Sequence, residues 1–364
     1  MNQLRLNERL LVLQFVCGLV FLAPAVALGQ DEPAALTRPA DGHVTFEPST
    51  KEADIPARFQ LAAHEFPYWQ SPLGKFLGTI AWQEVLFPSP VVTPHECNNT
   101  VHCEYFAPMG RGKRPGVIVL HILGGDFELS RVICRTLATS GTGALFVKMP
   151  YYGPRRDKKS KTRMISQDPE QTVRGMTQAA LDIRRAVTWL ETRDNIDPDQ
   201  LGIVGISLGG IVGAMTAAIE PRFSKACLVL AGGDFGQVLF ESAELAELRK
   251  EWQGKGITKD QVREVLRPID PLTYAHRLRD RKVLMMNAKF DKVIPRSSTD
   301  VLWEAIGKPE IIWWDAGHYS AAMYLPSGLG RMAVFFGDRD DVETARQAGG
   351  TDPELRSDGP NAGD

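Results

Sequence analysis

The feature that most constrains the fold is an alternation, from residue 116 onward, of short apolar runs with longer amphipathic stretches. Apolar runs of about five residues are typical of strands that are covered on both faces, as in a parallel sheet. Strands that alternate with helices in this way favour right-handed crossovers. The sequence therefore predicts an α/β fold, a doubly wound and mostly parallel sheet with helices on both faces. The six apolar runs are Val117–His121, Ala144–Lys148, Leu201–Ile206, Ala226–Leu230, Val283–Ala288 and Ile311–Trp314.

The stretches around these runs give further elements. Glu170–Glu191 carries apolar side chains at intervals of three and four residues, which predicts a helix with one stripe facing the sheet. Upstream, Thr79–Phe87 and Thr100–Phe106 are expected to be antiparallel edge strands. Residues 235–280 separate the fourth and fifth apolar runs by more than one crossover, so we interpret them as an insertion. It either lies near a substrate entrance or is a surface excursion without a catalytic role.

The first 29 residues have the organisation of a signal peptide. Arg5 and Arg9 precede a long apolar run, and the small residues Ala27 and Gly29 suit a signal peptidase. The chain is therefore expected to be exported, to the periplasm or outside the cell, with no membrane span after cleavage. The alternative is an uncleaved membrane anchor, because the apolar run is close to the length of a short membrane span.

The rest of the chain divides into three predicted parts. Residues 30–58 are rich in Pro, Ala, Asp and Glu, and we expect a solvated, disordered leader there. Residues 59–336 are expected to form one large domain. Residues 337–364 are polar, with many Gly and Asp residues, which is typical of a disordered tail.

Charge and cysteine content restrict the possible partners. The formal net charge of −2 lacks the basic excess of nucleic-acid-binding proteins, so no nucleic acid is expected. The sequence has no CxxC pair and no HExxH motif, so no metal or cofactor is expected. Cys97 and Cys103 flank a short polar stretch, and they form either a local disulfide or two unpaired thiols. Cys134 and Cys227 are expected to be small buried hydrophobes.

A candidate nucleophile lies at the end of the third apolar run. Gly205-Ile206-Ser207-Leu208-Gly209 matches the G-x-S-x-G nucleophile elbow, in which a serine occupies a sharp strand-to-helix turn. The small residues that follow Gly209 suit the start of a helix, whose N-terminal N–H groups would face an anion that forms at Ser207. The alternative is a glycine-rich tight turn with an idle serine.

A serine hydroxyl needs a base, and the base needs a group that orients it. His318 follows the last apolar run and Asp291 follows the run before it. Since the carboxyl ends of parallel strands meet at one edge of the sheet, both are expected near Ser207. Asp234 also follows a strand and is the alternative acid, whereas Asp315 is better suited to local capping.

A serine nucleophile of this kind also needs two N–H donors for the oxyanion. One is expected from Leu208, the residue after Ser207. The other is expected from the loop after the first core strand, at Leu123, with Ile122 as second choice. His121 is expected to brace that loop by hydrogen bonding.

These parts resemble the α/β-hydrolase superfamily, in particular its dienelactone-hydrolase-like and prolyl-oligopeptidase-like serine esterase branch. The resemblance covers roughly residues 116–336, and 149–156 also resembles the segment after the strand in abhydrolase-domain serine esterases. Two positions depart from the family pattern. Ile122 stands where members often have glycine, and Ser207 stands where dienelactone hydrolases have cysteine.

Other side chains near these loops allow two interpretations each. Tyr151, Tyr152 and Phe235 line a substrate pocket or pack at the sheet edge. Trp313 and Trp314 are expected to be packing residues. A basic run is expected to be a solvated loop, with an anion-binding patch as the alternative; it consists of Arg155, Arg156, Lys158, Lys159 and Lys161.

The resemblance implies a serine hydrolase that cleaves a small-molecule carboxylic ester through an acyl-enzyme on Ser207, with no cofactor. The alternatives are a small serine peptidase or acyltransferase of the same fold, or a non-catalytic binding protein.

Overall fold

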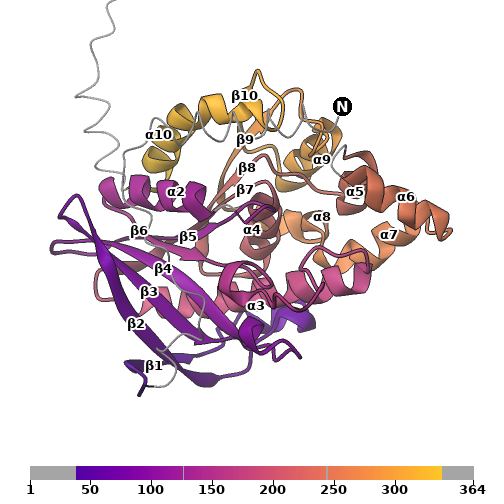
Figure 1. The fold of residues 1–364 in the computed structure, drawn as a ribbon. Coiled ribbons are helices and arrows are strands. Elements are labelled where there is room, and N and C mark those ends of the chain that lie inside the picture. Colours follow the sequence, from indigo (N-terminus) through magenta and orange to yellow (C-terminus); the bar gives the residue numbers. More distant parts are fainter. Residues whose placement is uncertain (1–37, 126, 243–244, 338–364) are drawn as a thin grey trace, which may run out of the picture.

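The computed structural model describes residues 38–125, 127–242 and 245–337, which contain one ten-stranded sheet (Figure 1). Its strand order is β1-β2-β3-β4-β6-β5-β7-β8-β9-β10. The first four strands are antiparallel, and the last six in sequence pair in parallel. The strands are β1 (Gly42–Phe46), β2 (His64–Phe76), β3 (Ile80–Pro88), β4 (Thr100–Pro108), β5 (Arg114–Leu120), β6 (Gly143–Val147), β7 (Ile196–Ile206), β8 (Phe223–Val229), β9 (Lys282–Ala288) and β10 (Glu310–Trp314).

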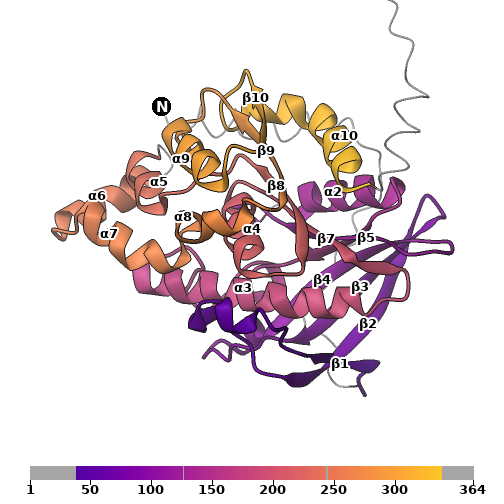
Figure 2. The same ribbon diagram turned by 180° about the vertical axis from the view of Figure 1, so that it is seen from behind.

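Helices cover both faces of this sheet (Figures 1 and 2). On one face, α2 (Phe127–Thr139) and α10 (Leu325–Phe336) share a core with alternate residues of the strands. On the other face, α3 (Pro169–Glu191), α4 (Leu208–Ile219) and α9 (Arg296–Ile306) share the larger core. The predicted doubly wound α/β fold is therefore confirmed.

The sequence-predicted elements fall where the apolar patterns place them. All six apolar runs are strands. The first five are buried between the two helix layers, whereas β10 lies at the edge of the sheet and is only partly buried. The predicted helix of 170–191 is α3. Asp168 caps its N-terminus, because the Asp168 side chain accepts a hydrogen bond from the Glu170 N–H. The two upstream segments are β3 and β4, antiparallel to each other as predicted.

The insertion projects from the C-terminal end of β8 (Figure 1). It contains α5 (Phe235–Glu241), α6 (Ala246–Gly254), α7 (Lys259–Leu266) and α8 (Pro271–Tyr274). The Trp252 indole N–H donates to the Gln167 carbonyl at 2.9 Å, and the Gln237 side chain donates to Ser297 at the start of α9 at 2.7 Å. The insertion thus packs between the start of α3 and the start of α9.

The expectation of a disordered leader over 30–58 is wrong for the part that the structure describes. Residues 42–46 form β1, which pairs antiparallel with β2, and Val44 and Phe46 are buried. Their alternation with polar neighbours is the period of a strand with one covered face. Composition alone predicts a leader over these residues, whereas the short alternation of apolar and polar residues indicates the strand.

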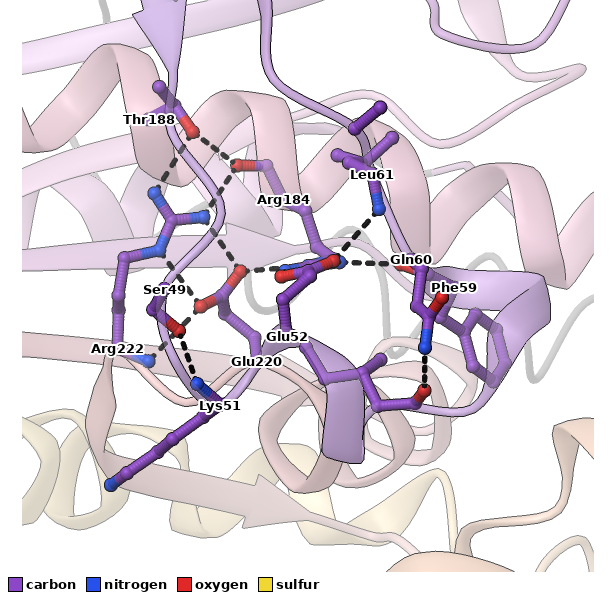
Figure 3. Close-up of polar contacts among 12 residues, drawn as sticks. Ser49, Lys51, Glu52, Phe59, Gln60, Leu61, Arg184, Thr188, Glu220 and Arg222 are labelled. Atoms are coloured by element: carbon purple, nitrogen blue, oxygen red, sulfur yellow. Dashed lines mark hydrogen bonds and ion pairs between the residues drawn. The ribbon is translucent and has the colours of Figure 1, made fainter.

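A buried charge network fixes the same segment to the domain (Figure 3). The Arg184 guanidinium of α3 donates to both carboxylate oxygens of Glu52, at 2.7 and 2.6 Å, and to Glu220 at 3.0 Å. Arg222 completes the network by donating to both oxygens of Glu220. Burial opposes the charged form of Glu52 and Glu220, but hydrogen bonds from the arginines outweigh it, so the pKa of each carboxyl is lowered.

One further expectation is corrected, and one open alternative is decided. Arg155 is fully buried and bonds Asp182 at 2.7 Å, so it does not belong to a solvated basic loop, although the other four residues of the basic run are exposed. Cys97 and Cys103 are both free thiols, and Cys103 is buried in β4.

Cys134 and Cys227 are buried, as expected for small hydrophobes. The segments interpreted as signal peptide (1–29) and, apart from Gly337, as disordered tail (337–364) lie outside the described residues. Within the described ranges, none of the helices combines the length and the apolar character that a membrane span requires.

Candidate active site

Ser207 occupies a strained turn between β7 and α4. Its φ of 56° lies in the left-handed region, which non-glycine residues rarely adopt. Glycines make this turn possible: a Cβ on Gly205 would lie 2.1 Å from the Gly209 carbonyl oxygen, and one on Gly209 would lie 2.7 Å from the His121 carbonyl oxygen. The turn lifts the Ser207 side chain above the C-terminal end of the sheet.

The structure brings Ser207, His318 and Asp291 together in one hydrogen-bonded relay. His318 Nε2 lies 3.1 Å from Ser207 Oγ, and His318 Nδ1 lies 2.7 Å from Asp291 Oδ2. The other carboxylate oxygen of Asp291 accepts the backbone N–H groups of Val293 and Ile294, each at 2.8 Å. These two bonds fix the carboxylate so that its free oxygen points at the imidazole.

The relay is largely shielded from solvent. Ser207 is 8% exposed, and the His318 and Asp291 side chains are 10% and 3% exposed. Water competes weakly for hydrogen bonds at such a site, so the three groups interact more strongly than they would on the surface. The arrangement can therefore move a proton from a hydroxyl to an imidazole that a carboxylate orients.

The two other carboxylates considered for the acid have different partners. Asp234 forms a bidentate ion pair with Arg263, at 2.9 and 2.6 Å, and accepts the Gln237 N–H at the start of α5. Asp315 is exposed and lies 3.4 Å from Lys289 Nζ. Neither pairs with His318 in the structure.

His121 braces the loop that follows β5, as expected. Its Nε2 accepts the Met149 N–H at 3.1 Å, so its Nδ1 carries the proton and donates to the Ile122 carbonyl at 2.8 Å. Burial lowers the pKa of His121 to about 4, which keeps the ring neutral at physiological pH.

This bracing orients the next peptide group. The Ile122 carbonyl and the Leu123 N–H belong to one trans peptide group, in which they point in opposite directions. His121 and Gly125 both donate to this carbonyl, so the Leu123 N–H points away from them. Among the described residues it has no hydrogen-bond acceptor. The Leu208 N–H, at the first position of α4, likewise has no acceptor within its helix.

The aromatic residues near the site differ in burial. Tyr151 and Phe235 are buried in the larger core. Tyr152 is partly exposed, and its ring packs edge-on against His121 at 4.6 Å. Trp314 stacks on Tyr324, and Trp313 lies under the Arg296 guanidinium, so both tryptophans pack as expected.

A hollow of about 700 Å³ lies elsewhere, where β8, β9 and β10 begin. It is at the opposite edge of the sheet from Ser207, and none of the relay residues lines it. In the parts of the chain that the structure describes, no group of three or more His, Cys, Asp or Glu side chains is arranged to hold a metal ion.

Comparison with protein families agrees with this geometry. The family described as alpha/beta hydrolase domain containing 18 matches residues 79–233, and the prolyl oligopeptidase family matches residues 175–308. The two matches overlap across the Ser207 turn and together span β3 to α9. The chain is an α/β hydrolase. The second match supports a place in the prolyl-oligopeptidase-like branch of these hydrolases.

Single proteins that are similar to this chain share less than a third of the aligned residues with it. An uncharacterized protein of Mycobacterium tuberculosis is 27% identical over 186 residues, which are 49% of this α/β hydrolase and 42% of that protein. The alignment thus spans less than half the length of that relative.

Solved structures share the fold. Acetyl xylan esterase 1 from Thermoanaerobacterium is 21% identical, with a TM-score of 0.58 over 74% of this chain and 86% of that one. The acylaminoacyl peptidase of Pyrococcus horikoshii is 16% identical, with a TM-score of 0.54 over 76% of this chain and 46% of that one. These similarities show the architecture of this α/β hydrolase and leave its substrate to be argued from its site.

Proposed function

We propose that this α/β hydrolase is a serine esterase that cleaves a small-molecule carboxylic ester through an acyl-enzyme on Ser207. The observation that carries the proposal is the unbroken relay from Ser207 Oγ to His318 to Asp291, with contacts of 3.1 and 2.7 Å. The acetyl xylan esterases among the structures of the same fold agree with ester chemistry.

The proposed reaction has two steps. His318 Nε2 takes the proton of Ser207 as its oxygen attacks the ester carbonyl, while Asp291 stabilises the imidazolium. The N–H groups of Leu208 and Leu123 receive the oxyanion, and loss of one such donor typically costs about 100- to 1000-fold in rate. His318 then protonates the leaving alcohol and activates the water that hydrolyses the acyl-enzyme.

Hydrolysis of p-nitrophenyl acetate, butyrate and octanoate tests this proposal, with aminoacyl p-nitroanilides in parallel. We expect turnover of at least one ester, little turnover of the anilides, and loss of activity in Ser207→Ala. Asp234→Asn is the matched control, because Asp234 is a carboxylate after a neighbouring strand that bonds Arg263 instead of the imidazole.

Activity lost equally in Ser207→Ala and Asp234→Asn would contradict the assignment of the acid. Preferential cleavage of the anilides would favour a peptidase over an esterase.

A further inference from the structure

Two buried polar side chains lie at the two ends of the loop that carries Asp291. Asn287 is the next-to-last residue of β9, and Thr299 lies in the first turn of α9. Their exposed fractions are 1% and 2%. The loop between them supplies the carboxylate of the relay, and the hydrogen bonds of both side chains go to Ala231 and to each other, not to His318 or Ser207.

Both side chains bond one carbonyl group, that of Ala231, just beyond β8. Asn287 Nδ2 donates to the Ala231 oxygen at 2.9 Å and to Thr299 Oγ1 at 3.0 Å. The Thr299 hydroxyl donates to the same Ala231 oxygen at 2.9 Å. The three bonds form a closed triangle in which every hydrogen of the Asn287 amide and of the Thr299 hydroxyl is used.

This triangle connects the acid loop to the strand beside the nucleophile. Val229, two residues before Ala231, accepts the Ser207 N–H at 2.8 Å through its carbonyl. The Ala231 carbonyl thus lies on the same strand exit that anchors Ser207, and it also holds both ends of the acid loop. Buried hydrogen bonds of this kind keep their geometry, because breaking one leaves an unsatisfied polar group.

We propose that Asn287 and Thr299 are positioning residues that hold Asp291 at hydrogen-bonding distance from His318. The proposal rests on the function proposed above. The Asn287 Oδ1 is buried and has no partner among the described residues, so the side-chain hydrogen bonds of Asn287 are the two that its nitrogen donates to Ala231 and Thr299. Catalytic geometry is sensitive to such placement, since an error of about 1 Å can cost about 100-fold in rate.

Thr299→Val tests the proposal, because valine keeps the volume and removes the hydroxyl. The second-order rate of modification by a fluorophosphonate probe should fall about tenfold or more, and kcat for the best p-nitrophenyl ester should fall with KM unchanged. Thr299→Ser restores the hydroxyl and should recover both. Asn287→Leu removes the other side chain of the triangle and should lower the same two rates. It tests the proposal if Thr299→Val fails to fold.

Thr142→Val is the matched control. The Thr142 hydroxyl is also buried but has no partner among the described residues, and it lies before β6, at the opposite edge of the sheet. This variant should retain the wild-type rates.

A double-mutant cycle with Asp291→Asn separates positioning from general destabilisation. If Thr299 acts through Asp291, the valine change should cost less than about twofold in the Asp291→Asn background. Rates for Thr299→Val equal to those of Thr142→Val would overturn the proposal, and so would the same loss in both backgrounds. A wild-type protein that the probe never modifies would instead refute the function proposed for Ser207.

Discussion

Several residues with a strained backbone lie just beyond the C-terminal ends of strands, close to the site. Tyr151, Ser207, Leu230 and Asp234 all have positive φ, and each follows the C-terminal end of β6, β7 or β8. Such conformations persist only where the surrounding structure enforces them. At Ser207, the Val229 carbonyl holds the N–H, while close backbone contacts at Gly205 and Gly209 leave no room for side chains.

Gly209→Ala tests this packing. The added Cβ would lie within 3.0 Å of backbone atoms of Leu120 and His121, so α4 must move away from the end of β5. We expect a loss of about 1–3 kcal/mol in the free energy of unfolding and slower modification of Ser207. Urea denaturation measures the first and probe kinetics the second.

Gly213→Ala is the control for that variant, in the same helix. Its nearest neighbours would be 3.9 Å away, and alanine is favoured over glycine in a helix by about 0.5–1 kcal/mol. It should be neutral or stabilising. Equal effects of the two substitutions would show that the contacts at Gly209 do not matter.

His121 gives the protein a pH dependence whose sign follows from its pKa. The pKa of His121 is about 6.5 in the unfolded chain. In the folded chain burial disfavours the imidazolium and lowers this pKa to about 4. The stability that neutral His121 contributes is therefore complete above pH 6.5 and is lost as the pH falls toward 4. The loss at pH 4 amounts to about 3 kcal/mol.

Replacement of His121 by Gln isolates this effect. Glutamine can still donate to Ile122 and accept from Met149, but it does not titrate. Urea denaturation between pH 7.5 and 4 should show a decline for the wild type that is about 3 kcal/mol larger than for His121→Gln. Parallel declines would contradict the buried, neutral His121.

At the scale of elements, buried ion pairs fix the segment before β2. Arg184 of α3 holds Glu52 through two hydrogen bonds. The Glu52 carboxylate also accepts the Leu61 N–H at 2.8 Å. One side chain therefore bonds the segment both to α3 and to a backbone group just before β2. Removal of one partner from a buried pair is costly because it leaves the other charge uncompensated.

Arg184→Met should therefore lower the free energy of unfolding by about 3–5 kcal/mol. Arg174→Met provides the contrast, since Arg174 and its partner Asp168 are 61% and 54% exposed and exposed pairs contribute about 0–1 kcal/mol. Urea denaturation of both variants measures the difference. A loss below about 1 kcal/mol for Arg184→Met would show that the network contributes little.

Buried polar contacts between distant segments are the part of the structure that the sequence predicts least. A carboxylate in a polar stretch predicts a solvated segment, and nothing local to Glu52 indicates a partner 132 residues away. The same holds for Arg155. Its neighbours in the sequence predict a surface cation, and only the fold brings Asp182 beside it. Asn287 and Thr299 were missed because the carbonyl that joins them belongs to a third segment.

At the scale of the whole molecule, the sheet explains why the relay itself was predictable. Residues 207, 291 and 318 each follow a parallel strand, and parallel strands end at one edge. The apolar runs therefore determine which loops meet, although the residues are far apart in the sequence. The antiparallel half was only partly predicted, since β1 and most of β2 have one open face and a weaker apolar pattern.

The account depends most on Ser207 as the nucleophile, and covalent modification tests this directly. After reaction with a fluorophosphonate, mass spectrometry of the intact protein should show one adduct, and peptide mapping should place it on Ser207. The Ser207→Ala protein should show none, with its fold unchanged by circular dichroism. A folded wild type without an adduct, or an adduct that persists in Ser207→Ala, would contradict the account.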